Sequence, residues 1–304
     1  MSPLSLTIAT RGSPLALWQA DHVAGLISAA HPEITIKTLV IKTKGDRILD
    51  RPLAEIGGKG LFVKEIEDAI LSGEADIAVH SMKDVPMHLP KGLCIGVMPK
   101  RGSVEDVFLS HTHPTPESLP PGSKLGSSSP RRKAQALLLR PDIEIAPLRG
   151  NIATRLEKLA KKEFDAIILA KAGLERLGLS APYMFELNKH NFIPAAGQGA
   201  LGVEFSENRA DLRALLVHID DPQTHACVKA ERAFIRELEA DCYAPVAAYA
   251  WMGDENTLYL RGLLANETGT CYVTGVKTGS RPEELGSALA NQLQKEACGK
   301  RFSC

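Results

Sequence analysis

The chain has 304 residues, and its 36 Lys and Arg are balanced by 36 Asp and Glu, so its formal net charge is zero. This balance excludes a general nucleic-acid binder, because phosphate contacts need a basic excess. Its composition is that of a globular protein, its length suggests two or three domains, and no stretch approaches the roughly 20 apolar residues of a membrane span. Without a basic signal region, a C-x-x-C pair or a metal motif, the chain is expected to be cytoplasmic, with free thiols and no metal.

The first two-thirds of the sequence alternate between strand-like and helix-like segments. This alternation predicts α/β units with largely parallel sheets. Strands are expected at residues 6–9, 34–41, 75–79, 143–145, 166–170 and 203–205, and helices at 14–30, 61–71, from 129 onwards, 151–162 and 171–177.

Two connections and a change of pattern complete the organisation. The glycine-rich stretch 42–60 predicts either a lid or a plain flexible loop, and the proline-rich stretch 111–122 predicts a surface connection. The last third predicts a separate α+β domain from near residue 220. Its expected helices are 224–240 and 282–297, and its expected strands are 246–251, 258–264 and 271–276.

Three predicted helix starts carry capping signatures. Ser13 and Ser129 each precede a proline, and Asn151 precedes the third helix. Arg131 and Arg132 fall in a first turn, where the helix dipole does not favour cations. A bound anion would explain them, because a guanidinium group binds carboxylate or phosphate bidentately. Simple capping remains the alternative for each start.

Polar residues directly follow the predicted strand 75–79. Lys83 and Asp84 come just after His80, and ligands of open α/β sheets bind beyond the carboxyl ends of strands. We expect these two residues to take part in chemistry, although a salt-bridged surface turn is the alternative.

Two glycine-rich motifs do not support nucleotide binding. Residues 197–202 match G-x-G-x-x-G, but a strand-like stretch follows where a Rossmann fold requires a helix. Residues 57–60 lack the earlier glycine and the Ser or Thr of a phosphate-binding loop. We reject both interpretations.

The zero net charge hides a segregation along the chain. Residues 124–176 hold 12 basic and 6 acidic side chains, whereas residues 177–260 hold 6 basic and 12 acidic ones. This pattern predicts a local basic cleft for an anionic small molecule, or else solvated helix faces.

Several motifs together resemble the porphobilinogen deaminase family over nearly the whole chain. They are residues 9–16 (ATRGSPLA), 57–62 (GGKGLF), 80–86 (HSMKDVP), 128–132 (SSPRR), 148–151 (LRGN) and 194–199 (PAAGQG). Their number and order make the resemblance far more specific than any single motif.

The resemblance implies an α/β fold with two lobes like those of periplasmic binding proteins and a smaller C-terminal α+β domain. The expected domains are residues 1–99 with 200–217, residues 100–199, and residues 218–304. The implied reaction joins four porphobilinogen molecules head to tail with loss of ammonia, and hydrolysis then releases hydroxymethylbilane. A monomer with no nucleic-acid or membrane partner is expected.

The resemblance also implies the roles of individual residues. Cys242, which its position in a turn alone marks only weakly as reactive, would carry a covalent dipyrromethane cofactor through a thioether. Asp84 would be the catalytic aspartate, with Lys83, Arg11, Arg149 and Arg155 also catalytic. The cofactor would contact Ser13, Lys83, Asp84, Ser129, Arg131 and Arg132. The substrate would contact Arg11, Arg149, Arg155, Arg176, Gln19, Lys59 and Gln198.

The competing class is a non-catalytic bilobed receptor for an anionic small molecule. It would explain a basic cleft between α/β lobes, but it leaves a third domain and Cys242 unexplained.

Overall fold

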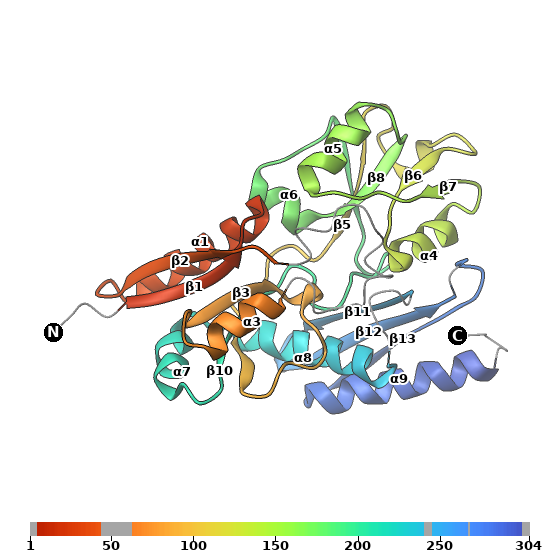
Figure 1. Cartoon of the computed structure of the whole chain (residues 1–304). Helices are drawn as coiled ribbons and strands as arrows, with labels where there is room; N and C mark the ends of the chain where they lie inside the picture. Colours follow the sequence, from red (N-terminus) through yellow and green to blue (C-terminus); the bar gives the residue numbers. More distant parts are fainter. Residues whose placement is uncertain (1–4, 44–62, 240–244, 267, 300–304) are drawn as a thin grey trace. The chain divides into compact units, whose positions relative to one another are not determined.

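The computed structural model describes residues 5–43, 63–239, 245–266 and 268–299 (Figure 1). The chain divides into two compact units. The first unit comprises residues 1–102 and 200–225, and the second comprises residues 103–199 and 226–304. Within the described residues, no helix has both the length and the apolar character needed to cross a membrane.

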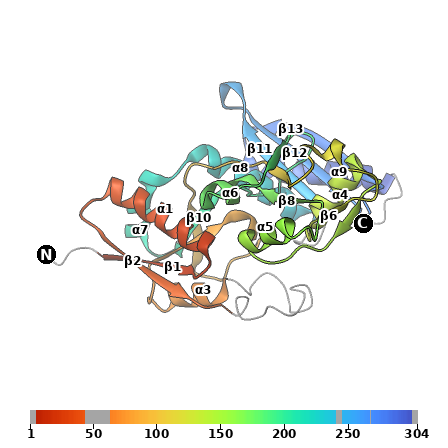
Figure 2. The ribbon, with the colours of Figure 1, turned by 90° about the horizontal axis from the view of Figure 1, so that it is seen from above.

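The first unit is built on a five-stranded sheet of order β2-β1-β3-β10-β4. Ile8 and Ala9 are neighbours on β1 and are both fully buried, because the two faces of the sheet carry separate cores. Helices α1 and α7 cover one face and α3 covers the other (Figure 2). The elements are β1 (Ser5–Arg11), α1 (Pro14–Ala30), β2 (Thr35–Ile41), α3 (Lys64–Leu71), β3 (Ile77–Ser81), β4 (Leu93–Val97), β10 (Leu201–Ser206) and α7 (Ala210–Leu216).

The second unit contains another five-stranded sheet, of order β7-β6-β8-β5-β9. Its two faces are again covered by helices, with α5 and α6 packed on one side and α4 on the other. The elements are β5 (Asp106–Ser110), β6 (Lys124–Gly126), α4 (Pro130–Leu139), β7 (Glu144–Ala146), α5 (Ile152–Ala160), β8 (Ala166–Ala170), α6 (Lys171–Leu177) and β9 (Tyr183–Leu187).

The C-terminal part of the second unit adds an antiparallel three-stranded sheet of order β11-β12-β13. One face of this sheet packs on two helices, and Gly262 lets the Phe234 ring of one helix and the Leu289 side chain of the other approach the strand closely. The other face joins residues 103–199 in a shared core that includes Ile193, Ala247 and Leu263. The elements are α8 (Pro222–Glu237), β11 (Val246–Met252), β12 (Leu258–Ala265), β13 (Tyr272–Gly279) and α9 (Pro282–Gly299).

The structure confirms the α/β class and the change to an α+β pattern near residue 220. The helix at 14–30 and the strand at 166–170 have the expected bounds. The division into three domains stays a prediction. The loop predicted at 42–60 lies outside the described residues except for Lys42 and Thr43, as does the start of the helix predicted at 61–71.

The prediction of largely parallel sheets holds for four strands of each sheet, and one strand in each is reversed. In the first sheet β10 runs antiparallel to β3 and β4, and in the second β5 runs antiparallel to β8 and β9. The remaining neighbours are parallel. Apolar periodicity reports the burial of a strand and not its direction, so the two reversed strands could not be recognised from the pattern. Strands β4, β5, β6 and β9 were not predicted.

Two glycines give opposite expectations for a substitution to Ala. A Cβ at Gly262 would lie 2.7 Å from two ring atoms of Phe234, so Gly262→Ala is expected to destabilise the fold by about 1–3 kcal/mol. At Gly25, in the middle of α1, a Cβ meets nothing within 4 Å, so Gly25→Ala is expected to stabilise by about 0.5–1 kcal/mol. Urea unfolding followed by circular dichroism measures both. Equal effects would contradict the packing described for Gly262.

Candidate functional site

In the first unit, the predicted site residues lie where β1 and β3 end. The two strands are parallel neighbours, so their carboxyl ends share one edge of the sheet. Arg11 is the last residue of β1, and the turn Met82–Asp84 directly follows β3. The Asp84 side chain is exposed and Lys83 is half-buried, so both are accessible at this edge. The structure thus brings Arg11, Lys83 and Asp84 to the same edge.

The turn that carries Lys83 and Asp84 is held by buried neighbours. The Gln19 side chain, which is buried, donates a hydrogen bond to the Ser81 hydroxyl at 2.7 Å. The backbone N–H of Met82 donates to the carbonyl of Ala200 at 3.0 Å, and the Met82 side chain is only 1% exposed. Gln19 therefore fixes the end of β3, in addition to any contact it makes with a ligand.

The three predicted helix caps are confirmed. The side-chain oxygens of Ser13, Ser129 and Asn151 each accept a hydrogen bond from a backbone N–H three residues ahead, at 3.3, 3.4 and 2.9 Å. These caps satisfy donors that would otherwise be free at the helix ends.

In the second unit, the arginines gather at the carboxyl ends of three parallel strands. Strand β6 pairs in parallel with both β7 and β8, so all three end at one edge of the sheet. Each is followed by a segment with predicted site residues, which are Ser129, Arg131 and Arg132 after β6, Arg149 and Arg155 after β7, and Arg176 after β8. The predicted site arginines of the basic segment 124–176 therefore all lie in segments that follow this edge, whereas Arg140 ends α4 and pairs with Asp142.

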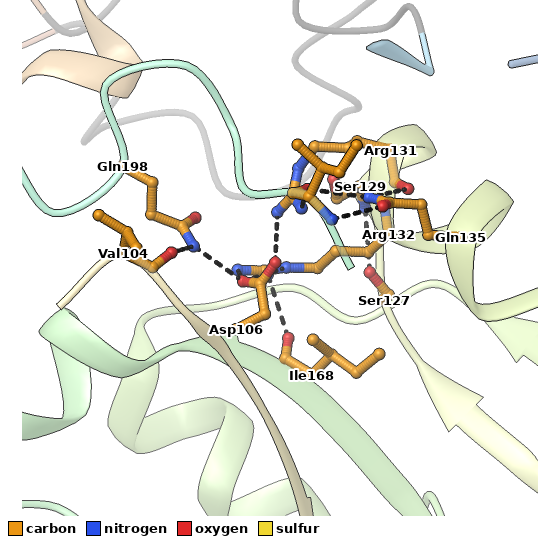
Figure 3. A network of polar contacts seen from close by, with 10 residues as sticks. Val104, Asp106, Ser127, Ser129, Arg131, Arg132, Gln135, Ile168 and Gln198 are labelled. Atoms are coloured by element: carbon orange, nitrogen blue, oxygen red, sulfur yellow. Dashed lines mark hydrogen bonds and ion pairs between the residues drawn. The ribbon is translucent and has the colours of Figure 1, made fainter. Parts of the chain in front are cut away.

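Arg131 and Arg132 are deeply buried, at 5% and 7% exposure, against the fully buried Asp106 (Figure 3). Nη2 of Arg131 lies 2.8 Å from Oδ2 of Asp106. Nε and Nη2 of Arg132 donate to Oδ1 at 3.1 and 2.7 Å. Backbone carbonyls of Ile193 and Ile168 accept further hydrogen bonds from the two Nη1 atoms. We call these three residues the Asp106 cluster.

The Asp106 cluster supplies an anion of the kind that the sequence predicts at this helix start. Burial by itself raises the pKa of the Asp106 carboxyl, but the charges and hydrogen bonds of Arg131 and Arg132 outweigh it and lower the pKa to about 2. One carboxylate faces two guanidinium groups, so the cluster keeps a positive charge. This charge would stabilise an anion bound close to the cluster.

Gln198 lies next to the Asp106 cluster. Its side-chain Nε2 donates to the carbonyl of Val104 at 2.7 Å and to Oδ1 of Asp106 at 3.1 Å (Figure 3). The side chain is 1% exposed. Strand β10 begins at Leu201, just after this turn, which confirms the rejection of a Rossmann motif at 197–202.

The other three arginines have different surroundings. Arg176 donates from Nη2 to the carbonyl of Gly199 at 2.7 Å, and burial lowers the pKa of its guanidinium. Arg155 donates from Nε to the carbonyl of Gly150 at 2.7 Å, which keeps its guanidinium at the start of α5. Arg149 is exposed. Arg149 and Arg155 are therefore the more accessible cations of this edge.

Two predicted site residues are not placed, and two buried acids were missed. Lys59 and Cys242 lie outside the described residues. Asp106 and Glu231 were not singled out from the sequence, although both are fully buried. The signal at Asp106 is an acidic residue directly before the apolar run 107–109, and Glu231 sits among apolar residues of α8. Neither pattern names a partner.

Each unit by itself offers groups that suit one feature of a small polycarboxylate that also carries N–H groups. The guanidinium groups of the second unit are of the kind that pairs with carboxylates. In the first unit, the exposed Asp84 carboxylate can accept hydrogen bonds from N–H groups. A dipyrromethane has both features, with acetate and propionate side chains and two pyrrole N–H groups. The residues present therefore fit this group. Among the described residues, no three His, Cys, Asp or Glu side chains are arranged to hold a metal ion.

Comparisons with known proteins agree with this chemistry. Residues 6–214 match the family model "Porphobilinogen deaminase, dipyromethane cofactor binding domain", and residues 225–295 match "Porphobilinogen deaminase, C-terminal domain". A porphobilinogen deaminase of Nitratidesulfovibrio vulgaris (strain DSM 19637 / Miyazaki F) is 50% identical, covering 97% of this chain and 95% of that protein. That of Lawsonia intracellularis (strain PHE/MN1-00) is 51% identical, covering 96% and 95%.

Among solved structures, the chain is similar to a putative methionine-binding lipoprotein from Bacillus subtilis subsp. subtilis str. 168. It is 13% identical, with a TM-score of 0.42, and the match covers 72% of this chain and 92% of that one.

The Asp106 cluster generates a stability prediction. Asp106→Asn leaves two buried guanidinium groups without their carboxylate, so we expect a loss of about 3–5 kcal/mol in the free energy of unfolding at neutral pH. The control is Asp142→Asn, which removes the surface partner of Arg140 and is expected to change little. Urea unfolding of both variants measures the difference. If Asp106→Asn left the free energy of unfolding unchanged, the ion pairs of the Asp106 cluster would not stabilise the fold.

The same carboxylate sets a pH dependence. Because the folded chain lowers the pKa of Asp106 from 3.8 to about 2, the ionised form stabilises the fold above about pH 4. This contribution disappears as the pH falls toward about 2. Between these two values, the wild-type chain should lose more free energy of unfolding than Asp106→Asn does. Equal losses would show that Asp106 does not titrate as described.

Proposed function

The chain belongs to the porphobilinogen deaminase family and contains its dipyrromethane cofactor binding domain, and from this premise we propose the reaction and the role of each site residue. The reaction joins four porphobilinogen molecules head to tail and releases ammonia at each step. Hydrolysis then frees hydroxymethylbilane, a precursor in tetrapyrrole biosynthesis. The observation that carries the residue roles is the gathering of arginines at the carboxyl edge of the second unit's sheet.

The cations hold the carboxylates of the substrate. Each pyrrole ring carries an acetate and a propionate, so every condensation adds about two negative charges. Arg149 and Arg155 offer accessible guanidinium groups for them, and bidentate pairing also fixes the orientation of each ring. Arg11, Arg176, Gln19, Lys59 and Gln198 complete the substrate contacts.

A second set of residues holds the cofactor, which is attached through a thioether to Cys242. When bound, the dipyrromethane supplies the two-ring starting point for the first condensation. Lys83, Ser13 and Ser129 provide donors, and the Asp106 cluster supplies the residual positive charge of Arg131 and Arg132. These groups orient the carboxylates of the cofactor through hydrogen bonds and charge, and form no covalent bond with them.

Asp84 is the catalytic carboxylate in this proposal. Loss of ammonia leaves positive charge on the substrate ring, and an ionised carboxylate stabilises that charge while accepting pyrrole N–H donors. Its position after the buried Met82 supports this role, because the turn is anchored from both sides. Asp84 also assists the movement of protons during condensation.

The setting of the enzyme follows from the same proposal. It is a transferase that acts as a monomer on a small-molecule substrate, in the cytoplasm and without a nucleic-acid or membrane partner. A non-catalytic receptor for anions is the alternative. Ehrlich's reagent distinguishes the two, because it gives a colour with protein-bound dipyrromethane and none with a simple receptor.

The mass of the purified protein tests the attachment of the cofactor to Cys242. We expect the purified native chain to have a mass above that of its sequence by one dipyrromethane, and Cys242→Ser to have the bare mass. Cys271→Ser removes an exposed free thiol and serves as the control, which should keep the added mass. Intact-mass spectrometry measures all three. An unmodified native chain with normal turnover would remove Cys242 from this role.

Removal of the Asp84 charge tests its proposed catalytic role. Asp84→Asn keeps the shape of the side chain but removes its charge, so turnover should fall by about 100- to 1,000-fold or more. The fold should persist, because Asp84 is exposed. Asp21→Asn, at an exposed position of α1, is the matched control and should retain turnover. Porphobilinogen consumption and thermal melting are the measurements, and near-normal turnover of Asp84→Asn would exclude it from the mechanism.

A further inference from the structure

We propose that Glu231 is a positioning residue of this enzyme. It accepts a hydrogen bond from the turn Gly197–Gly199. The same turn is hydrogen-bonded to Arg176 and to the Asp106 cluster. The inference rests on the proposed function, because it concerns the geometry of arginines that bind substrate and cofactor in that proposal.

Glu231 lies on α8 and is completely buried. Its Oε2 accepts a hydrogen bond from the backbone N–H of Gly197 at 2.7 Å, and its Oε1 accepts one from the backbone N–H of Ala250 at 2.8 Å. A carboxylate offers acceptors only, so it suits two N–H donors that approach from different elements. Glu231 therefore ties α8 to β11 and to the turn at once.

The turn itself depends on such anchors. Gly197 and Gly199 have φ values of 74° and 84°, in the left-handed region that favours glycine. Glycine also leaves the backbone freer to move, so its conformation must be fixed by neighbouring contacts. The hydrogen bond to Glu231 is one such contact.

Each residue of the turn makes a separate link. Gly197 donates to Glu231, and the side chain of Gln198 donates to Asp106 at 3.1 Å. The carbonyl of Gly199 accepts from Nη2 of Arg176 at 2.7 Å. Three consecutive residues thus connect a buried carboxylate of α8 to Arg176 and, through Asp106, to Arg131 and Arg132. Figure 3 shows the part of this path from Gln198 to the Asp106 cluster.

This path has a consequence for the reaction. Bidentate recognition of carboxylates is sensitive to the position of the guanidinium group, and a displacement of about 1 Å is enough to lower the efficiency of an enzyme strongly. Glu231 touches no substrate in this arrangement. It acts through the turn, and its loss should weaken substrate binding even where the fold survives.

Glu231→Gln tests the proposal with little change in shape. An amide keeps one acceptor oxygen but turns an NH₂ group toward the other N–H, so one of the two hydrogen bonds is replaced by a contact between donors. Glu237→Gln is the matched control. It lies on the same helix, is exposed, and accepts a hydrogen bond from Asn291 at the surface.

The kinetic measurement compares KM and kcat of cofactor-loaded enzyme well below the melting temperature of each variant. We expect Glu231→Gln to raise KM for porphobilinogen about tenfold, and Glu237→Gln to leave it unchanged. A residue that only stabilises the fold would lower the melting temperature without altering KM of the folded enzyme. An unchanged KM in folded Glu231→Gln therefore overturns the proposal.

Amide hydrogen exchange gives a second measurement that does not depend on turnover. Glu231→Gln should accelerate exchange both at residues 195–199 and in the first turn of α4, whereas Glu237→Gln should change neither. Acceleration that stops at residues 195–199 would overturn the proposed path. If wild-type chain consumed no porphobilinogen, the proposed function would fail, and exchange alone would still decide whether Glu231 acts on the arginines.

Should Glu231→Gln fail to fold, Glu231→Asp takes its place. Asp retains the charge and both acceptor oxygens but is shorter by one methylene group, so it cannot span both N–H donors. The same rise in KM and the same pattern of exchange are expected, and their absence overturns the proposal.

Discussion

The second unit depends on the ion pairs between the buried Asp106 carboxylate and the guanidinium groups of Arg131 and Arg132. Two guanidinium groups without an anion could not be withdrawn from water, because uncompensated buried charge is strongly destabilising. Asp106 supplies that anion from the first position of β5, which lies opposite Ala170 at the end of β8. The antiparallel direction of β5 is what brings an N-terminal residue to the edge where the parallel strands end.

Both units place their proposed site residues by the same rule. Parallel strands end together, and the polar segments that follow them meet at one edge of the sheet. The antiparallel strands begin at the same edge, and residues at their starts anchor these polar segments. In the first unit Ala200, just before β10, accepts the hydrogen bond that anchors Met82. In the second, β5 supplies Asp106. The mixed topology thus places the proposed site residues after the parallel strands, and the residues that support them at the starts of the antiparallel strands.

The sequence predicts local features of this arrangement well. Capping by Ser13, Ser129 and Asn151 depends on residues three positions apart, so short-range patterns were sufficient. The partner of Arg131 and Arg132 lies some 25 residues away in the chain, on a strand that the periodicity did not predict. Strand direction and buried ion pairs are tertiary properties, and apolar spacing contains neither. The family motifs identified the arginines but not what holds them.

The zero net charge of the chain conceals arginines in different surroundings. The basic segment 124–176 suggested a local basic cleft for an anion, yet the arginines that follow β6 and β7 differ in their exposure. Arg131 and Arg132 are buried and share a carboxylate, whereas Arg149 is exposed and Arg155 is half-buried. A cation already paired inside the protein changes little in hydration when a ligand binds, while an exposed one must exchange water for carboxylate. The buried pair therefore sets the geometry of the edge. In the proposed reaction, the more accessible Arg149 and Arg155 contact a product whose negative charge grows with each added ring.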